Sequence, residues 1–349
     1  MFGKKGLLCC AIACSAVLIV GCDEKEELVE DTSVIEEQTI PATAEVELPY
    51  VTPFTGEKIA DEITTRPIIA TINNHPAARP QSGIGSADVI YEMLAEGNVT
   101  RLLALFQSEI PDNIGPIRSA RDYFIEIADG LDAFYIAHGY SPEAQTMLTN
   151  GVVDNINGMQ YDGSIFKRSS DRVAPHNSYI AGENIETAAE KVNASLLYQK
   201  KVSYTFYEPD EHAKIGVQAN SVSVKYSNYD SFNSLYTYDA DTNTYSRQCA
   251  DEITTDYLTN EPIALSNVLF FEMNHSIIDN AGRRSIDITS GGTAYVFQEG
   301  LMREVRWENI DGVLKAVEED GSEVKLVPGH TWIHFVPTNP GIAASVTYS

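Results

Sequence analysis

The pattern of apolar and polar positions changes twice along the chain. Residues 7–20 form an uninterrupted run of apolar and small side chains behind Lys4 and Lys5. Residues 23–49 then contain ten acidic side chains against a single lysine. From residue 50 onward, short apolar runs alternate with polar stretches rich in Gly, Asn and Asp, which is typical of folded sequence.

In the first folded half, β-branched apolar runs predict strands and helical spacing predicts helices. The expected strands cover residues 68–72, 87–94, 100–107 and 133–139. The expected helices cover residues 119–134, 141–150 and 181–194. The second of these helices has Ser141 at its N-cap, Pro142 at its first position and Gly151 after its end. Mixed strands and helices predict an α/β (or α+β) domain over residues 50–195.

The second half contains little helical pattern. Strand-like segments cover residues 221–227, 264–274, 285–300, 301–309 and 331–337. Residues 234–247 predict a hairpin that turns near residues 239–243. We therefore expect a smaller, mainly β domain over residues 200–349.

The N-terminal segment predicts export and lipid attachment. A basic start, an apolar run and the tetrapeptide Ile19–Cys22 resemble the lipobox of bacterial lipoproteins. This predicts a lipoprotein signal peptide over residues 1–21 and a diacylglycerol on the Cys22 thiol. The alternatives are an ordinary signal peptide with an incidental cysteine, or a short membrane anchor. After cleavage only Cys249 would remain besides Cys22, so no internal disulfide could form.

Charge limits the partners of the protein. Its 24 Lys and Arg face 50 Asp and Glu, which gives a net charge of −26. Nucleic acid is not expected as a partner, because phosphate binding needs a basic surface. The acidic segment at residues 22–49 cannot bury enough apolar surface to fold, so we expect it to be a tether, and an acidic docking tail is the alternative. The expected location is the cell membrane, lipid-anchored on its extracytoplasmic side.

Polar side chains cluster after the first expected strand of the α/β domain. Asn73, Asn74, His75 and Arg79 lie in a stretch whose prolines exclude regular structure, so we expect a loop that binds a ligand or satisfies its own backbone. Charged residues within apolar segments need partners. A structural ion pair between Glu96 and Arg101 is the simplest interpretation, and Glu96 as a general base is the alternative.

A second cluster surrounds residues 118–122. Ser119 followed by Asp122 predicts a capping box, which would place Arg118 and Arg121 at the positive end of a helix. Cations are unfavourable there, so an anion is expected to offset them. That anion could be a ligand phosphate or carboxylate, or a buried acidic side chain of the chain itself.

Three histidines could join these clusters. His138 follows an expected strand, and His176 precedes Asn177 in a segment with several basic residues. His75, His138 and His176 lack close metal-ligand spacing, so neither a metal site nor a cofactor is expected. The sequence also lacks a nucleophile elbow, a P-loop and a dinucleotide fingerprint.

Together these segments resemble the YerB-like family of bacterial lipoproteins. The matching stretches are NNHPAARPQSG, ADVIYEMLAEGNVTR, GPIRSARDYF, APHN, NVLFF, SGGTAYVF and VPGHTWIHFVP. The resemblance implies a membrane-anchored extracytoplasmic protein with two such domains, and it implies no particular activity. Family members often carry His-x-Asp near the hairpin, where this chain has Thr254-Thr255-Asp256, so a role for that histidine does not transfer.

Two functions remain open from the sequence. The first is a lipoprotein that binds an anionic cell-envelope component, small molecule or peptide. Its candidate ligand-binding residues are Asn73, Asn74, His75, Arg79, Arg101, Arg118, Ser119, Arg121, His176 and Asn177. The second is a hydrolase or transferase acting on a cell-envelope polymer, with Glu96, His75 or His176 as the general base.

Overall fold

The computed structural model describes residues 48–208 and 210–349, which belong to one compact unit, Val46–Ser349. The predicted signal peptide, the predicted lipidation site Cys22 and the predicted tether up to residue 47 lie outside the described residues. None of the helices in the described part of the chain is long and apolar enough to cross a membrane.

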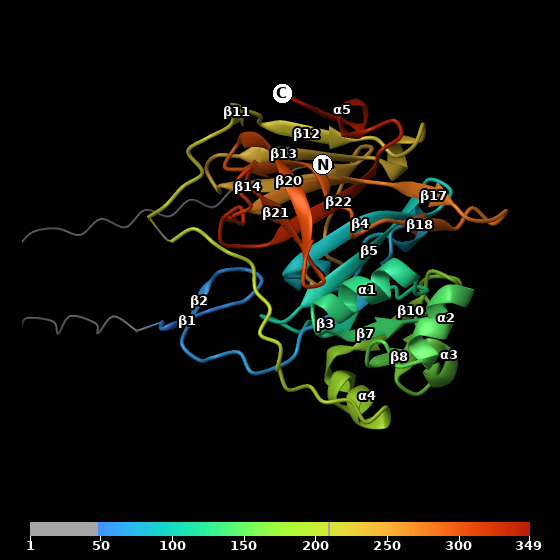
Figure 1. Ribbon diagram of the computed structural model, residues 1–349. Coiled ribbons are helices and arrows are strands. Elements are labelled where there is room, and N and C mark those ends of the chain that lie inside the picture. The colour runs from blue at the N-terminus through green and yellow to red at the C-terminus, as the bar shows by residue number, and fades with distance from the viewer. Residues whose placement is uncertain (1–47, 209) are drawn as a thin grey trace, which may run out of the picture. The chain divides into compact units, whose positions relative to one another are not determined.

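A mixed sheet of eleven strands organises the described chain (Figure 1). Five strands come from the first half: β3 (Ile68–Asn73), β4 (Val89–Glu96), β5 (Val99–Phe106), β7 (Phe134–Ala137) and β8 (Asn155–Asn157). Six come from the second half: β11 (Val217–Gln218), β16 (Asn267–Met273), β19 (Gly292–Gln298), β20 (Leu301–Ile310), β21 (Val313–Val317) and β22 (Thr331–Pro337). Their order is β11-β20-β19-β16-β22-β4-β5-β3-β7-β8, and β21 pairs with β20.

The two halves of the chain meet within this sheet. β22 pairs in parallel with β4, with Thr331 opposite Val89 and His334 opposite Glu92. The mixed α/β first half and the mainly β second half confirm the predicted fold class. The domain boundaries at residues 195 and 200 stay predictions, because one sheet contains strands from both halves.

Helices cover one face of the large sheet. α1 (Asp122–Gly130) and α2 (Pro142–Thr149) pack against the β3–β5–β7 region, and Phe124 and Ile127 of α1 are fully buried there. A small hairpin of β17 (His275–Ile277) and β18 (Arg284–Ile286) lies beside α1 (Figure 1).

Two smaller sheets and one helix cover the opposite face. The first sheet has the order β15 (Glu252–Ile253), β14 (Thr244–Cys249), β13 (Ser234–Asp239), β12 (Ser221–Val224) and β23 (Val346–Tyr348). The second has the order β6 (Asn113–Ile114), β10 (Ser178–Ala181) and β9 (Phe166–Arg168). The helix is α4 (Ile185–Lys191), whose buried side chains join the same core. The remaining elements are short: β1 (Tyr50–Val51), β2 (Lys58–Ile59), α3 (Gly158–Tyr161), α5 (Ile342–Ser345) and four 3₁₀ turns.

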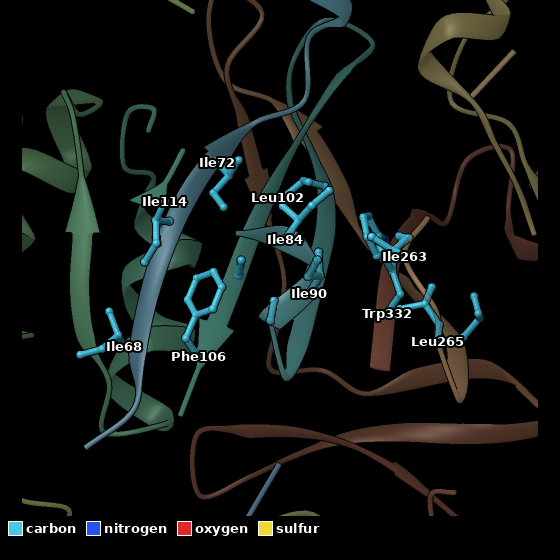
Figure 2. Packing of buried hydrophobic residues seen from close by; sticks show 14 of the residues in the cluster. Ile68, Ile72, Ile84, Ile90, Leu102, Phe106, Ile114, Ile263, Leu265 and Trp332 are labelled. Atoms are coloured by element: carbon cyan, nitrogen blue, oxygen red, sulfur yellow. The ribbon is translucent and has the colours of Figure 1, made fainter. Parts of the chain in front are cut away.

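Burial on both faces explains the uninterrupted apolar runs of the sequence. Successive side chains of a strand point to opposite faces. In β3, Ile68 and Ile72 belong to the core under the smaller sheets, whereas Ile69 belongs to the core under α1. Figure 2 shows Ile68 and Ile72 in the first of these cores, together with Leu102 and Phe106 from β5. Every position of such a strand is therefore apolar or internally satisfied.

Candidate functional site

The parallel strands β3, β7 and β8 end at one edge of the large sheet. β5 runs antiparallel to β3 and begins at this edge, so Arg101 lies opposite Asn73. Ligand sites of open α/β sheets commonly lie where the carboxyl ends of parallel strands meet, because the connecting loops leave the sheet there. The loops that follow β3 and β7 therefore reach the same edge.

Residues 115–121 pass between these two strand ends. The backbone N–H of Arg118 donates to the Thr71 carbonyl (2.8 Å), and the Arg118 carbonyl accepts from the N–H of His138 (2.9 Å). The N–H of Ala120 then donates to the Gly139 carbonyl (3.0 Å). This ladder fixes Arg118 between the end of β3 and the end of β7.

The same ladder shows that the predicted capping box at Ser119 is wrong. α1 begins at Asp122, and its N-cap residue is Arg121, whose side chain makes no capping hydrogen bond. Ser119 Oγ donates instead to the carbonyl of His138 (3.3 Å). A helix cannot start at Ser119 because its neighbours Arg118 and Ala120 use their backbone groups to pair with strand ends.

Two of the candidate arginines share one internal carboxylate. Arg101 donates to Glu96 Oε2 (2.7 Å) and to the Ser119 carbonyl (2.9 Å). Arg121 forms an ion pair with the other oxygen of Glu96. The predicted Glu96–Arg101 pair is therefore present, and the cation at the helix start has an internal partner.

Arg118 has a different environment. Its guanidinium makes no hydrogen bond or ion pair with any residue in the described ranges, and its Nε is shielded from solvent without an acceptor. Burial and, to a smaller extent, the positive charge of Arg101 together lower the pKa of this group to about 10. Arg118 is thus a partly buried cation without an internal anion in the described part of the chain, and an external anion would stabilise it.

His75 and His176 lie beside Arg118 as a stacked pair. Their ring centroids are 4.8 Å apart and their planes differ by 28°. Burial lowers the pKa of both rings, and the positive charge of Arg118 contributes to the lowering in each. We call Asn73, His75, Arg118 and His176 the arginine–histidine cluster.

Asn73 fixes the protonation of the His176 ring, and the backbone of Ala77 fixes that of the His75 ring. Its Oδ1 accepts from the backbone N–H of His75 (3.0 Å), so its Nδ2 faces and donates to His176 Nδ1 (2.8 Å). The backbone N–H of Ala77 donates to His75 Nδ1 (3.1 Å). A neutral imidazole that accepts at Nδ1 carries its proton on Nε2. Neither Nε2–H donates to another residue within the described ranges, so both can donate to a ligand.

The electrostatic environment keeps these rings neutral. Burial lowers the pKa of His75, and Arg79 and Arg118 lower it further. Burial also lowers the pKa of His176, with further contributions from His75, Arg118 and Arg172. Protonation would additionally place an N–H at Nδ1 opposite an existing donor. The cluster therefore offers one guanidinium and two neutral N–H donors, which together suit an anionic oxygen ligand.

His138 is held in a separate arrangement. Its Nε2 accepts from Arg168 (2.9 Å), so its Nδ1 carries the proton and donates to Ser178 Oγ (2.7 Å). Ser178 is buried, and the histidine cannot take its proton. The nearby Asp162 pairs with Arg168. The Ser178–His138 contact is therefore not the base-activated nucleophile of a hydrolase.

The loop that carries His176 is held by Asn177. The Asn177 side chain donates to the carbonyls of Ser169 (3.1 Å) and Arg172 (3.3 Å) and accepts from Arg168 (3.2 Å). Arg172 donates to the carbonyl of Pro80 (2.6 Å), which ties this loop to the one after β3. Asn177 thus positions the loop rather than facing a ligand.

Asn74 and Arg79 belong to a second polar cluster. Asn74 Nδ2 donates to Glu92 Oε1 (3.0 Å), and Arg79 donates to the Asn74 carbonyl (2.8 Å) and to the Ser231 carbonyl (2.8 Å). Thr100 donates to the same Glu92 oxygen (2.8 Å). These predicted binding residues therefore face the second half of the chain.

Glu92 is the centre of this second cluster. Its Oε2 accepts from Arg247 (3.0 Å) and from Trp332 Nε1 (3.0 Å), and the side chains of Glu92 and Arg247 are each 1% exposed. Burial alone would raise the pKa of Glu92, but Arg247, His334 and Thr100 outweigh it and hold the pKa below its usual value. We call Asn74, Glu92, Thr100, Arg247 and Trp332 the Glu92 cluster.

The protonation of the histidine nitrogens also decides whether this site could hold a metal ion. Among the described residues, no group of three or more His, Cys, Asp or Glu side chains could hold a metal ion. His75 and His176 are neighbours, yet their Nε2 atoms carry protons and offer no lone pair to a metal.

Sequence reasoning missed two positioning arginines. Arg168 and Arg172 were seen only as part of a basic segment, and they fix His138 and the His176 loop through hydrogen bonds to a ring nitrogen and to carbonyls. Their position just before residues 174–177 was the only sequence feature that could have indicated this role. Arg247 was missed altogether, because nothing near it in the sequence indicates Glu92 as its partner.

Comparison with known proteins places the chain in a family. Residues 54–195 match the model "Protein of unknown function (DUF3048) N-terminal domain", and residues 222–333 match the corresponding C-terminal domain. The chain is 38% identical over 336 residues to "Putative lipoprotein YerB" of Bacillus subtilis (strain 168), covering 96% of each chain. A crystal structure of the YerB protein from Bacillus subtilis matches with a TM-score of 0.77 and 38% identity, over 86% of this chain and 99% of that one. The chain therefore belongs to the DUF3048 family of two-domain proteins, which includes the YerB protein of Bacillus subtilis.

Proposed function

We propose that this protein is an extracytoplasmic lipoprotein that is anchored through Cys22 and binds an anionic component of the cell envelope. The binding site is the arginine–histidine cluster at the carboxyl edge of the large sheet. One observation carries the proposal: Arg118 is partly buried and makes no contact with an acceptor among the described residues. Its neighbours Arg101 and Arg121, by contrast, both pair with Glu96.

The surrounding groups support an anion rather than a cation or a neutral ligand. The Nε2–H groups of His75 and His176 add two donors beside the guanidinium. Charge-assisted hydrogen bonds to carboxylate or phosphate are about twice as strong as neutral ones. The overall charge of −26 would repel an anion at long range, so affinity has to come from these local contacts.

The geometry gives less support to the hydrolase or transferase alternative. A general base needs a free lone pair. The Nδ1 atoms of His75 and His176 already accept hydrogen bonds, and protonation of Glu96 would break its ion pairs with Arg101 and Arg121.

Calorimetric titration of the full-length protein in detergent with inorganic phosphate and with citrate tests the binding site. We expect Arg118→Gln to weaken binding about tenfold or more, because a hydrogen bond to a charged group contributes about 1.5–3 kcal/mol. Arg306→Gln removes an exposed arginine on β20 and is the matched control. The site is refuted if the wild type binds neither anion, or if Arg118→Gln binds as tightly as Arg306→Gln.

The anchor is tested separately. Cys22→Ala should prevent incorporation of a palmitate analogue in cells, because the thiol is the proposed attachment point. Equal labelling of Cys22→Ala and wild type would remove Cys22 as the lipid site.

A further inference from the structure

A hollow of about 250 Å³ lies beside β8, the last strand of the large sheet. Its walls come from α2, β8 and α3, which lie together in the green part of Figure 1. Tyr140, which follows the end of β7 and pairs with Ala120, also lines it.

The side chains around this hollow are uncharged. Two tyrosines, Tyr140 and Tyr161, and two exposed glutamines, Gln145 and Gln160, line it. Asn155 contributes a further amide. Each amide provides both donors and an acceptor, which matches the dual hydrogen-bonding character of hydroxyl groups. Tyrosine rings add flat apolar surfaces with a polar tip. This combination suits a polyhydroxylated ring better than a charged or purely apolar group.

The hollow adjoins the arginine–histidine cluster through the backbone. Ala120 pairs with Tyr140, and the Ser141 N–H donates to the Ala120 carbonyl (3.2 Å). Ala120 is two residues after Arg118 on the same ladder. Asn157 also bonds to both backbone groups of Gly139, which holds β8 against this segment. Arg118 and the hollow therefore lie on segments that are joined directly through Ala120 and Tyr140.

We propose that the anion bound at Arg118 belongs to a saccharide, and that the hollow beside β8 binds one of its sugar rings. This inference rests on the anion-binding function proposed above and adds the class of ligand. The ligand is a glycan or sugar derivative that bears a phosphate or carboxylate. An acidic peptide fits less well, because its flanking charges would find no counter-charge in the hollow.

Titration of the full-length protein with glucose 6-phosphate, inorganic phosphate and glucose tests this assignment. We expect glucose 6-phosphate to bind about tenfold more tightly than phosphate, since two or three added hydrogen bonds of about 0.5–1.5 kcal/mol each suffice. Gln145→Ala/Gln160→Ala should abolish that advantage and leave phosphate affinity unchanged. Both glutamines are exposed, so the fold should tolerate their loss. Gln218→Ala, on the distant edge strand β11, is the matched control.

The possible outcomes separate the two proposals. If phosphate binds through Arg118 but glucose 6-phosphate binds no more tightly, the saccharide inference fails and the anion site stands. A sugar-phosphate advantage that survives in Gln145→Ala/Gln160→Ala also overturns the inference. If a triglutamate peptide binds more tightly than glucose 6-phosphate, the ligand class is wrong. If no anion binds to the wild type, the proposed function itself fails.

Discussion

The Glu92 cluster and the arginine–histidine cluster lie on neighbouring strands, but their charged groups differ in whether they have partners within the protein. In the Glu92 cluster each carboxylate oxygen accepts two hydrogen bonds, and the carboxylate and its arginine are almost fully buried. In the arginine–histidine cluster a guanidinium and two N–H donors have no acceptor among the described residues. The carboxylate of the first cluster is fully engaged within the protein, whereas the donors of the second are available to a ligand.

The two clusters also differ in which halves of the chain supply their residues. Glu92 and Thr100 come from the first half, whereas Arg247 and Trp332 come from the second, so the Glu92 cluster joins the two halves. The arginine–histidine cluster is formed by the first half alone, at loops beyond the strand ends. A site on such loops can change its contacts without disturbing the sheet below. We therefore expect changes in the Glu92 cluster to affect folding and changes at Arg118 to affect binding.

Arg247→Leu should have the largest effect, on stability. It leaves the buried Glu92 carboxylate without its counter-charge, which typically costs about 3–5 kcal/mol. Denaturant unfolding of the variant and the wild type at neutral pH measures this loss. Glu92→Met/Arg247→Leu removes both charges and should lose less than Arg247→Leu alone. A loss below about 1 kcal/mol for Arg247→Leu would show that the pair does not hold the halves together.

Acid should weaken the same region through His334. Burial lowers the pKa of this ring to about 4, while nearby Glu92 raises it and Arg247 lowers it. Its nitrogens bond to the hydroxyls of Tyr226 (3.1 Å) and Tyr236 (2.6 Å). The unfolded ring takes up its proton near pH 6.5, so stability falls as the pH drops from about 7 towards 4.

Between pH 7 and pH 5, proton uptake by this ring in the unfolded state should lower the free energy of unfolding by about 2 kcal/mol. His334→Gln keeps hydrogen-bonding groups for both tyrosines and cannot titrate. We expect its free energy of unfolding to depend less on pH than that of the wild type over this interval. Parallel urea titrations at pH 7 and pH 5 provide the measurement, and equal pH dependence of the two proteins would contradict it.

Much of the fold could be predicted from the sequence, because strands buried on both faces give continuous apolar runs. α2 could also be predicted, since Ser141 caps it by accepting from the Ala144 N–H (3.1 Å). The pairings between strands that are distant in the sequence could not be predicted. Nothing local indicates that β22 would lie beside β4, or that Arg247 would meet Glu92 across 155 residues. The start of α1 was misplaced because a tertiary ladder uses the backbone near Ser119.

The candidate site shows the same limit. Residue types indicated Asn73, His75, Arg118 and His176 among the candidate binding residues, and the structure brings Asn73, His75 and His176 into contact. Residue types could not distinguish Arg118 from Arg121, because the difference depends on where Glu96 lies. Sequence therefore predicts which residues can bind an anion, and tertiary structure decides which of them already have one.

Separate replacement of these two arginines sharpens that distinction. Arg121→Gln removes an ion pair to Glu96 and should lower the free energy of unfolding by about 1.5 kcal/mol. Arg118→Gln removes a partly buried cation without an internal partner, so stability should stay equal or rise slightly. Thermal and urea unfolding of both variants without added anions measures this. An equal loss in the two variants would indicate that Arg118 has an internal role as well.

The smallest expected effect concerns the histidine pair. His75→Phe keeps an aromatic ring stacked on His176 and removes one Nε2–H donor. The Ala77 N–H that loses its acceptor is exposed, so water can replace the ring nitrogen and stability should not change. Phosphate affinity should fall about fivefold, which corresponds to one hydrogen bond of about 1 kcal/mol. Because the ring donates as a neutral group, this decrease should be the same at pH 7 and pH 8. A decrease seen only at low pH would mean that His75 binds the anion as an imidazolium, and it would contradict the protonation that Asn73 and Ala77 impose.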